Sequence, residues 1–174
     1  RIYAIGDVAG AAQFTHMANY HAGVVIRRAL FRLPARVRLD AVPWVTYTDP
    51  ELAHVGLDEQ AARRQYGEVE ILRQPFAGND RAIAERRTEG LVKVVIGRRG
   101  RIFGATIVGP HAGEIIQPWV LAITRKLPIK AMTAPIIPYP TLSELNKRAA
   151  ISYYEKTMGN PWLRGAIRFL AKFG

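Results

Sequence analysis

The sequence contains no cysteine. Disulfide bonds and thiolate metal sites both need this residue, so neither can form from the residues present. Any thiol chemistry would have to be supplied by residues outside this sequence. The histidines show no ligand spacing on a shared element, so the sequence predicts no metal site. They are His16, His21, His54 and His111.

Long apolar runs are also missing. A membrane-spanning helix needs about 20 consecutive, mainly apolar residues, and no run in this sequence approaches that length. No charged segment followed by an apolar one opens the sequence, as a secretory leader would. These two absences predict a cytoplasmic protein.

Acidic residues are few, because 14 Asp and Glu stand against 25 Lys and Arg, a formal net charge of +11. Such an excess can indicate a nucleic-acid partner. The basic residues are scattered in pairs such as Arg27-Arg28, Arg63-Arg64 and Arg98-Arg99, and no nucleic-acid-binding motif accompanies them. We therefore predict a solvated basic surface and no nucleic-acid partner.

Hydrophobic residues make up 49% of the 174 residues, enough to bury one core. The sequence opens on Arg1 and passes directly into an apolar strand at residues 2–5, so we interpret it as part of a longer protein. An acidic turn at Gly6-Asp7 follows, then a helix from about residue 12 to 31. We place a domain boundary near Asp40, which makes residues 1–40 a first unit.

The sequence pattern of residues 41–158 predicts a second unit. Strands are predicted at residues 45–47, 53–57 and 69–72, and a hairpin at 91–96 and 102–108 around Gly100. Between them, Asp58 can cap a helix that Gly67 ends. Another helix is predicted over residues 112–126. The pattern predicts an α+β fold in which helices flank an antiparallel sheet.

Two helices are predicted near the C-terminus. Thr141 can cap a helix that begins at Leu142 and ends at residues 159–161, with Glu144 completing a capping box. Residues 159–174 then form a basic amphipathic helix, which we expect to dock on its own dimer rather than on an anionic membrane surface. Its apolar stripe is Trp162, Leu163, Ala166, Ile167 and Leu170, and its basic face is Arg164, Arg168 and Lys172.

The opening residues Arg-Ile-Tyr-Ala-Ile-Gly-Asp resemble the second FAD-binding motif of the pyridine nucleotide-disulfide oxidoreductases. Further segments follow in the order that this family shows, and they cover the sequence to about Lys156. The resemblance is closest to mercuric reductases and lipoamide dehydrogenases. The segments are residues 42–43, 47–51, 55–57, 90–93, 104–105, 108–110 and 112–114.

This resemblance implies a cofactor site at the start of the sequence. Gly6 and Asp7 would close the FAD strand, with the Asp7 carboxylate accepting hydrogen bonds from the ribityl chain. Phe14, Thr15 and His16 would lie at a helix N-terminus that faces the flavin pyrimidine ring. His16 is expected to be held in place rather than to act chemically. FAD and NAD(P) would bind in the full-length protein, and little FAD would stay on this part alone.

The resemblance also implies a catalytic pair at Tyr139 and Glu144, although with one departure. Thiol-disulfide members have histidine where this sequence has Tyr139, within Tyr-Pro-Thr-Leu-Ser-Glu. A phenol with a pKa of about 10 cannot exchange protons at neutral pH as an imidazole near 6.5 does. Mercuric reductases resemble this sequence more closely, because they have a tyrosine at this position. The C-terminal cysteine pair of those enzymes is absent from this sequence. A packed interface aromatic at Tyr139 and a helix-capping role for Glu144 are the alternatives.

The functional expectation is therefore the C-terminal part of an FAD-dependent oxidoreductase. It would pass electrons from NAD(P)H through FAD to a disulfide, mercuric ion or another acceptor, and residues 41–158 would form a homodimer. The alternative is a non-catalytic dimerisation module. A Gly-rich nucleotide fingerprint and Cys-x4-Cys upstream would distinguish the two.

Overall fold

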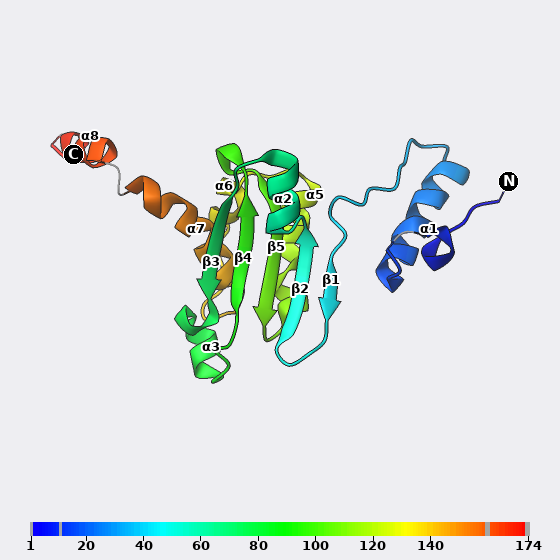
Figure 1. Cartoon of the computed structure of the whole chain (residues 1–174), viewed down its shortest axis with the longest axis horizontal. Coiled ribbons are helices and arrows are strands. Elements are labelled where there is room, and N and C mark those ends of the chain that lie inside the picture. Colours follow the sequence, from blue (N-terminus) through cyan, green and yellow to red (C-terminus); the bar gives the residue numbers. More distant parts are fainter. Residues whose placement is uncertain (1, 11, 159–160, 173–174) are drawn as a thin grey trace.

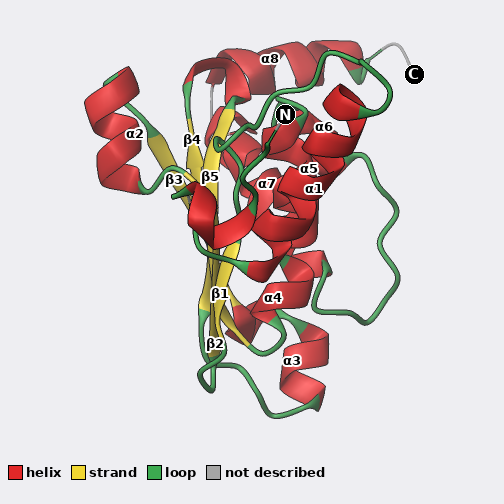
Figure 2. Cartoon of the chain, turned by 90° about the vertical axis from the view of Figure 1, so that its right-hand side faces the viewer, coloured by secondary structure: helices red, strands yellow, loops and turns green. Residues whose placement is uncertain are grey.

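The computed structural model describes residues 2–10, 12–158 and 161–172. Its centre is one sheet with helices on both faces (Figures 1 and 2). Helix α1 (Thr15–Ala29) lies beyond one edge of this sheet, and helix α8 (Pro161–Leu170) lies at the other end of the molecule (Figure 1).

The sheet has five strands in the order β1-β2-β5-β4-β3, and each neighbouring pair is antiparallel. This arrangement confirms the predicted α+β fold class. The strands are β1 (Trp44–Thr46), β2 (Glu51–Gly56), β3 (Glu70–Pro75), β4 (Leu91–Ile96) and β5 (Ile102–Gly109).

The predicted hairpin between β4 and β5 is confirmed. β-branched residues make up four of the six positions of β4 and four of the eight of β5, and they suit a pleated, buried surface. The chain reverses through a short 3₁₀ turn, η3 (Arg98–Gly100), in which Arg99 and Gly100 both have left-handed backbone angles. Gly100 adopts this conformation without the steric cost that a side chain brings.

Helices cover the sheet unequally. The larger helical layer packs on one face, whereas α2 lies on the other (Figure 2). The remaining helices are η1 (Gly6–Ala9), α2 (Glu59–Tyr66), η2 (Phe76–Gly78), α3 (Asp80–Ala84), α4 (Ala112–Ile115), α5 (Gln117–Thr124), α6 (Lys130–Thr133) and α7 (Glu144–Met158).

The main core lies between the sheet and the larger helical layer. Trp119, Ile116 and Leu145 are fully buried there against strand residues such as Ile107. Asn146 is the polar member of this region, since its amide oxygen accepts the Trp119 indole N–H at 2.7 Å and its nitrogen donates to the Ile115 carbonyl. Both ends of the buried amide are therefore satisfied, as burial requires.

The strand predicted at residues 2–5 is wrong. These residues are extended but belong to no strand, and Ile2 is 100% exposed. A strand exists only where a neighbour completes its hydrogen bonds, and no described segment lies beside this one in a sheet. Arg1 lies outside the described residues.

Two predicted helices begin or divide differently. The first begins at Thr15 rather than near residue 12. The helix predicted over residues 112–126 is divided into α4 and α5, with Pro118 in the first turn of α5. Proline has no backbone N–H, so a continuous helix would lose a hydrogen bond there, whereas the first turn of a new helix tolerates it.

The predicted capping box at Thr141 is also wrong. Helix α7 begins at Glu144, and the Thr141 hydroxyl donates to the Pro138 carbonyl at 2.8 Å instead of accepting from the helix. The local turn thus competes successfully for the hydroxyl. The predicted end of this helix at Gly159 and Asn160 lies outside the described residues.

The predicted C-terminal helix is present as α8, which follows α7 and lies away from the strands (Figure 1). Most of the predicted apolar stripe, including Trp162, lies outside the residues whose side chains are described. Within the described ranges, no helix has the length and apolar character needed to cross a membrane.

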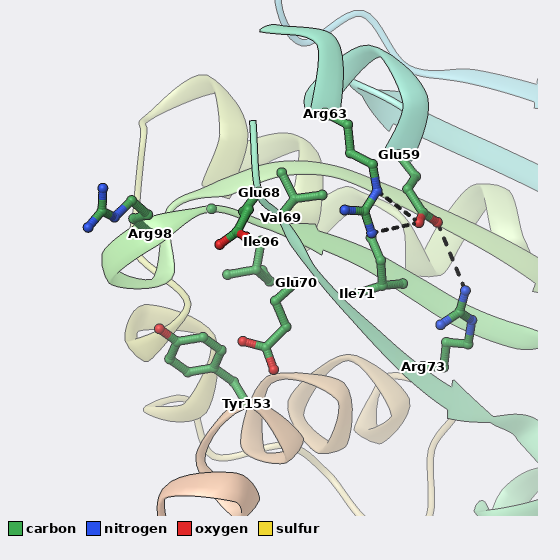
Figure 3. Close-up of a pocket in the computed structure, with 11 residues that line it drawn as sticks. Glu59, Arg63, Glu68, Val69, Glu70, Ile71, Arg73, Ile96, Arg98 and Tyr153 are labelled. Atoms are coloured by element: carbon green, nitrogen blue, oxygen red, sulfur yellow. Dashed lines mark hydrogen bonds and ion pairs between the residues drawn. The ribbon is translucent and has the colours of Figure 1, made fainter. Parts of the chain in front are cut away.

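An ion network links α2 to the sheet. Arg73 and Lys93 are direct cross-strand partners, and two like charges in this position repel. Glu59 lies between them, 2.8 Å from Lys93 and 4.0 Å from Arg73, and it also pairs with Arg63 at 3.0 Å. Glu59, Arg63 and Arg73 border an open hollow of about 570 Å³ (Figure 3). The hydrogen bonds from Lys93 and then Arg63 lower the pKa of Glu59.

We expect Glu59→Gln to reduce the stability of the chain at neutral pH, because Arg73 and Lys93 would face each other without a carboxylate between them. A lowered pKa means that Glu59 stabilises the fold above its ordinary value of 4.5, and this contribution disappears as pH falls through the lowered value. Urea unfolding across a pH series measures the effect. Glu68→Gln, at the rim of the same hollow, is the matched control, and equal losses in both variants would contradict the prediction.

Candidate functional site

The Gly6-Asp7 turn occupies the 3₁₀ helix η1, which packs against α1. Gly6 is buried with a φ of +67°, and a Cβ at this position would lie 3.0 Å from the Ala18 Cβ. Glycine is therefore required both by its backbone angle and by the close helix. Asp7 is exposed, and its carboxylate has no hydrogen bond or ion pair within the described ranges. The turn thus exposes the Asp7 carboxylate as a hydrogen-bond acceptor, while Gly6 is held in place by its packing against α1.

His21 supports this turn from within α1. Its side chain is only 5% exposed, and its Nδ1 atom accepts the Gly6 backbone N–H at 3.1 Å. The neutral ring then carries its proton on Nε2, which is buried without a hydrogen-bond partner among the described residues. This role could not be predicted from the sequence, because His21 meets Gly6 only when η1 folds back on α1.

The N-terminus of α1 has free backbone donors. Phe14 is the N-cap residue and supplies no side-chain acceptor, so the first N–H groups of the helix, at Thr15 and His16, keep no capping partner. Phe14 stacks on the His16 ring with centroids 5.0 Å apart. His16 Nε2 lies 2.9 Å from the Pro43 carbonyl oxygen. This contact favours the expected supporting role of His16, since the ring links α1 to the segment before β1.

A hollow of about 600 Å³ opens beside this helix end. Its walls come from the start of α1, from β1 and from α4. Glu51 is one wall residue whose carboxylate already accepts the Gly113 N–H at 3.0 Å. Free N–H donors at a helix N-terminus suit an electron-rich ring edge, and the free Asp7 carboxylate suits a chain of hydroxyl groups. The residues present therefore fit the edge of a flavin nucleotide.

Tyr139 lies in the loop between α6 and α7. Its side chain is 69% exposed, yet its hydroxyl donates to Asp80 Oδ2 at 2.9 Å. This hydrogen bond, followed by the negative charge of Asp80, raises the pKa of Tyr139. The phenol is consequently held in its protonated form as a donor, and Asp80 is a partner that the sequence pattern did not reveal.

Two further contacts hold the Tyr139 loop and helix α7 on the region before α3. The buried Asn79 side chain donates to the Thr141 carbonyl at 3.1 Å, and Arg148 donates to the Gly78 carbonyl. Glu144, the other predicted catalytic residue, does not bond to Tyr139. Its Oε2 atom is buried without a hydrogen-bond partner among the described residues. The negative charge of Glu144 nevertheless contributes to the raised pKa of Tyr139.

The two groups of predicted site residues lie far apart within one chain. Asp80 belongs to α3, beside the β3 edge of the sheet, whereas Asp7 and Phe14 accompany α1 beyond the β1 edge (Figure 1). The full width of the sheet separates them. A single copy therefore cannot bring Tyr139 to the Gly6-Asp7 turn.

Comparison with known proteins identifies the class. The profile described as "Pyridine nucleotide-disulphide oxidoreductase, dimerisation domain" matches residues 42–150. This chain therefore belongs to the pyridine nucleotide-disulfide oxidoreductase family, as the sequence pattern predicted.

Individual relatives agree with this assignment. A dihydrolipoyl dehydrogenase from Rhizobium etli is 37% identical over 160 residues, covering 90% of this chain and 33% of the relative. A mercuric reductase from Staphylococcus aureus is 36% identical over 154 residues, covering 88% and 28%. The chain spans about a third or less of the length of these curated relatives.

Solved structures show the same fold. LpdA from Mycobacterium tuberculosis superposes with a TM-score of 0.81 at 26% identity, covering 87% of this chain and 33% of LpdA. The flavoprotein disulfide reductase RclA from Escherichia coli, in its Cu(II) complex, gives a TM-score of 0.79 at 26% identity, with 86% and 34% covered. In residues 2–10, 12–158 and 161–172 of this chain, no group of three or more His, Asp or Glu side chains could hold a metal ion.

We expect His21→Ala to loosen the Gly6-Asp7 turn, because a buried N–H without an acceptor costs about 1–3 kcal/mol. Amide hydrogen exchange at Gly6, followed by NMR, should become faster. His21→Asn should restore part of the protection, since its amide oxygen can take the place of Nδ1. His54→Asn, in the sheet, is the control for general destabilisation, and unchanged exchange at Gly6 in His21→Ala would refute the proposed support.

Asp80 is the main influence on the Tyr139 hydroxyl. In Asp80→Asn the pKa of Tyr139 should fall towards its ordinary value of 10.0, because the carboxylate that raises it is gone. NMR titration of ring-labelled tyrosine measures the change. Glu144→Gln should produce a smaller fall, since its effect follows that of Asp80. Equal falls in both variants would contradict the assignment of Asp80 as the main partner.

Proposed function

We propose that this chain is the C-terminal part of an FAD-dependent oxidoreductase that transfers electrons from NAD(P)H through FAD to a disulfide, mercuric ion or another acceptor. Within that enzyme, residues 41–158 supply the homodimer interface. The turn and helix start at Gly6, Asp7 and residues 14–16 supply one edge of the FAD site. The family membership of residues 42–150 supports the proposal.

The separation of the two residue groups carries this proposal. Asp7 and the α1 N-terminus lie at one edge of the sheet, and Tyr139 with Asp80 lies near the other. In a two-fold symmetric dimer the same surface of both copies forms the interface, and a residue of one copy meets a different residue of the other. Tyr139 of one copy can then meet the flavin edge of the other. A site completed across the interface would account for a chain that carries both the flavin edge and Tyr139 at opposite edges of its sheet.

The chemistry at Tyr139 limits the acceptor. Asp80 raises the pKa of the phenol, so Tyr139 stays protonated at neutral pH and does not act as a base. Its single O–H is donated to Asp80 in the free chain and has to turn from Asp80 to bond an electron acceptor. An acceptor that gains negative charge on reduction, or a bound soft metal with anionic ligands, suits such a donor. A thiol that needs a nearby base suits it less. FAD, when bound, supplies the two-electron chemistry. The residues of this chain would orient the flavin edge and the acceptor, and Tyr139 would supply a hydrogen bond to the acceptor.

In the full-length protein, we expect Tyr139→Phe to retain flavin and to lower turnover with the natural acceptor by about tenfold or more, because one oriented donor is lost. Turnover should be measured with disulfides, quinones and mercuric ion as acceptors. Tyr139→His tests the converse, since it restores an imidazole beside the unpaired Glu144 carboxylate and should favour disulfide acceptors. Unchanged turnover of Tyr139→Phe with every acceptor would remove Tyr139 from the site.

Mixed dimers provide the control for the arrangement across the interface. Subunits carrying Asp7→Ala should lose flavin, and subunits carrying Tyr139→Phe should keep it without full turnover. A random mixture of the two should regain about a quarter of wild-type activity, because half the dimers then hold one complete site. A mixture as inactive as its components would mean that Tyr139 and the flavin edge do not combine between copies.

A further inference from the structure

Helix α8 has an apolar side and a basic side. Ile167 and Leu170 are three residues apart and share one side of the helix, while Arg168 and Lys172 are four residues apart and share another. Ile167 is 52% exposed and Leu170 is 67% exposed. Large aliphatic side chains on the surface of a charged helix form a surface that favours burial.

The body of the chain does not provide that burial. The described members of the hydrophobic core come from the strands and from helices up to α7, and none comes from α8. Figure 1 shows α8 beyond the end of α7, away from the strands. Among the α8 side chains that the structure describes, none belongs to the core of its own chain, so the expected docking on its own dimer would have to use the second copy. The described apolar residues Ile167 and Leu170 are therefore open to a surface outside this chain.

Charge distinguishes the possible surfaces. After Glu155, the sequence contains four basic residues and no acidic one, so this segment is positive throughout. A second copy of the chain carries the same formal charge of +11, and on average it repels a basic helix. An anionic lipid surface offers dense negative charge to the basic side and an acyl boundary to the apolar side.

Length fixes how such a helix can meet a bilayer. Ten helical residues span about 15 Å, roughly half of the hydrocarbon thickness, so α8 is too short to cross it. It can lie in the plane of the interface, where about 5–10 Å of depth is enough to bury one side.

We propose that α8 binds the surface of membranes that contain anionic lipid, with Ile167 and Leu170 entering the headgroup boundary and Arg168 and Lys172 contacting lipid phosphates. The helix is an anchor that holds the rest of the protein at the bilayer. This role is independent of the oxidoreductase proposal, because it uses none of the residues assigned to the flavin edge or to the interface tyrosine.

Co-sedimentation of the 174-residue chain with vesicles tests the anchor. Binding is expected to vesicles of mixed phosphatidylglycerol and phosphatidylcholine, and little binding to phosphatidylcholine alone. Raising the salt concentration should weaken binding, because lipid charge is screened. Ile167→Ser/Leu170→Ser and Arg168→Glu/Lys172→Glu should each reduce partitioning by at least about tenfold.

Matched variants on the body control for general surface changes. Ile83→Ser/Leu121→Ser removes the same residue types at sites that are 52% and 59% exposed, and Arg98→Glu/Arg99→Glu makes the same charge change at the hairpin turn. Both should bind vesicles as the unmodified chain does. The proposal is overturned if the unmodified chain ignores anionic vesicles, or if body and α8 variants lose binding equally. Dimer dissociation in α8 variants whose vesicle binding is intact would instead assign the helix to a second copy.

Discussion

Pairing of β5 on both of its edges is the constraint on which the rest of the structure depends. This strand bonds to β2 along one edge and to β4 along the other, so it joins the two halves of the sheet. Most of its residues are buried on both faces. One face meets the Trp119 layer, and the other meets the smaller cluster of Ala62, Val95 and Phe103 under α2. Loss of this strand would remove both clusters.

The sheet also decides where chemistry can occur. Its width separates the α1 end from the α3 end, and both ends carry polar residues that its core does not need. His21 is buried and accepts the Gly6 N–H. Asp80 accepts the hydroxyl of Tyr139, whose side chain is otherwise exposed. Neither contact is required for the hydrophobic clusters of the body. These two hydrogen bonds instead hold the Gly6-Asp7 turn and the Tyr139 hydroxyl in fixed positions at the two edges of the sheet.

The sequence predicted the body better than its ends. Strands β4 and β5 follow from β-branched runs, and α2 follows from Asp58, whose side chain accepts the Ala61 N–H at 2.6 Å, and from Gly67 beyond it. These signals are local. The strand expected at residues 2–5 failed because pairing depends on a neighbour, which periodicity cannot show. The capping box failed because Thr141 had two possible partners, and its spacing could not tell that Pro138 would be the nearer one.

The candidate site shows the same division. Gly6, Asp7 and Tyr139 could be named from the resemblance, because they stand in recognisable segments. His21 and Asp80 could not, since each is defined by a contact between residues that are 15 or 59 positions apart. The position of α8 likewise could not be read from its amphipathic pattern, which is equally compatible with a packed and an exposed helix.

The hydrogen bond from Tyr139 to Asp80 has a thermodynamic consequence for association. An exposed tyrosine normally samples several rotamers, and a partner that binds it must offset the entropy lost when one is selected. Here the hydroxyl is held by Asp80, and the loop is held by Asn79, which donates to the Thr141 carbonyl. The side chain is thus preorganised before any partner arrives. More of the contact energy is then available as affinity, and dissociation slows without any enlargement of the contact area.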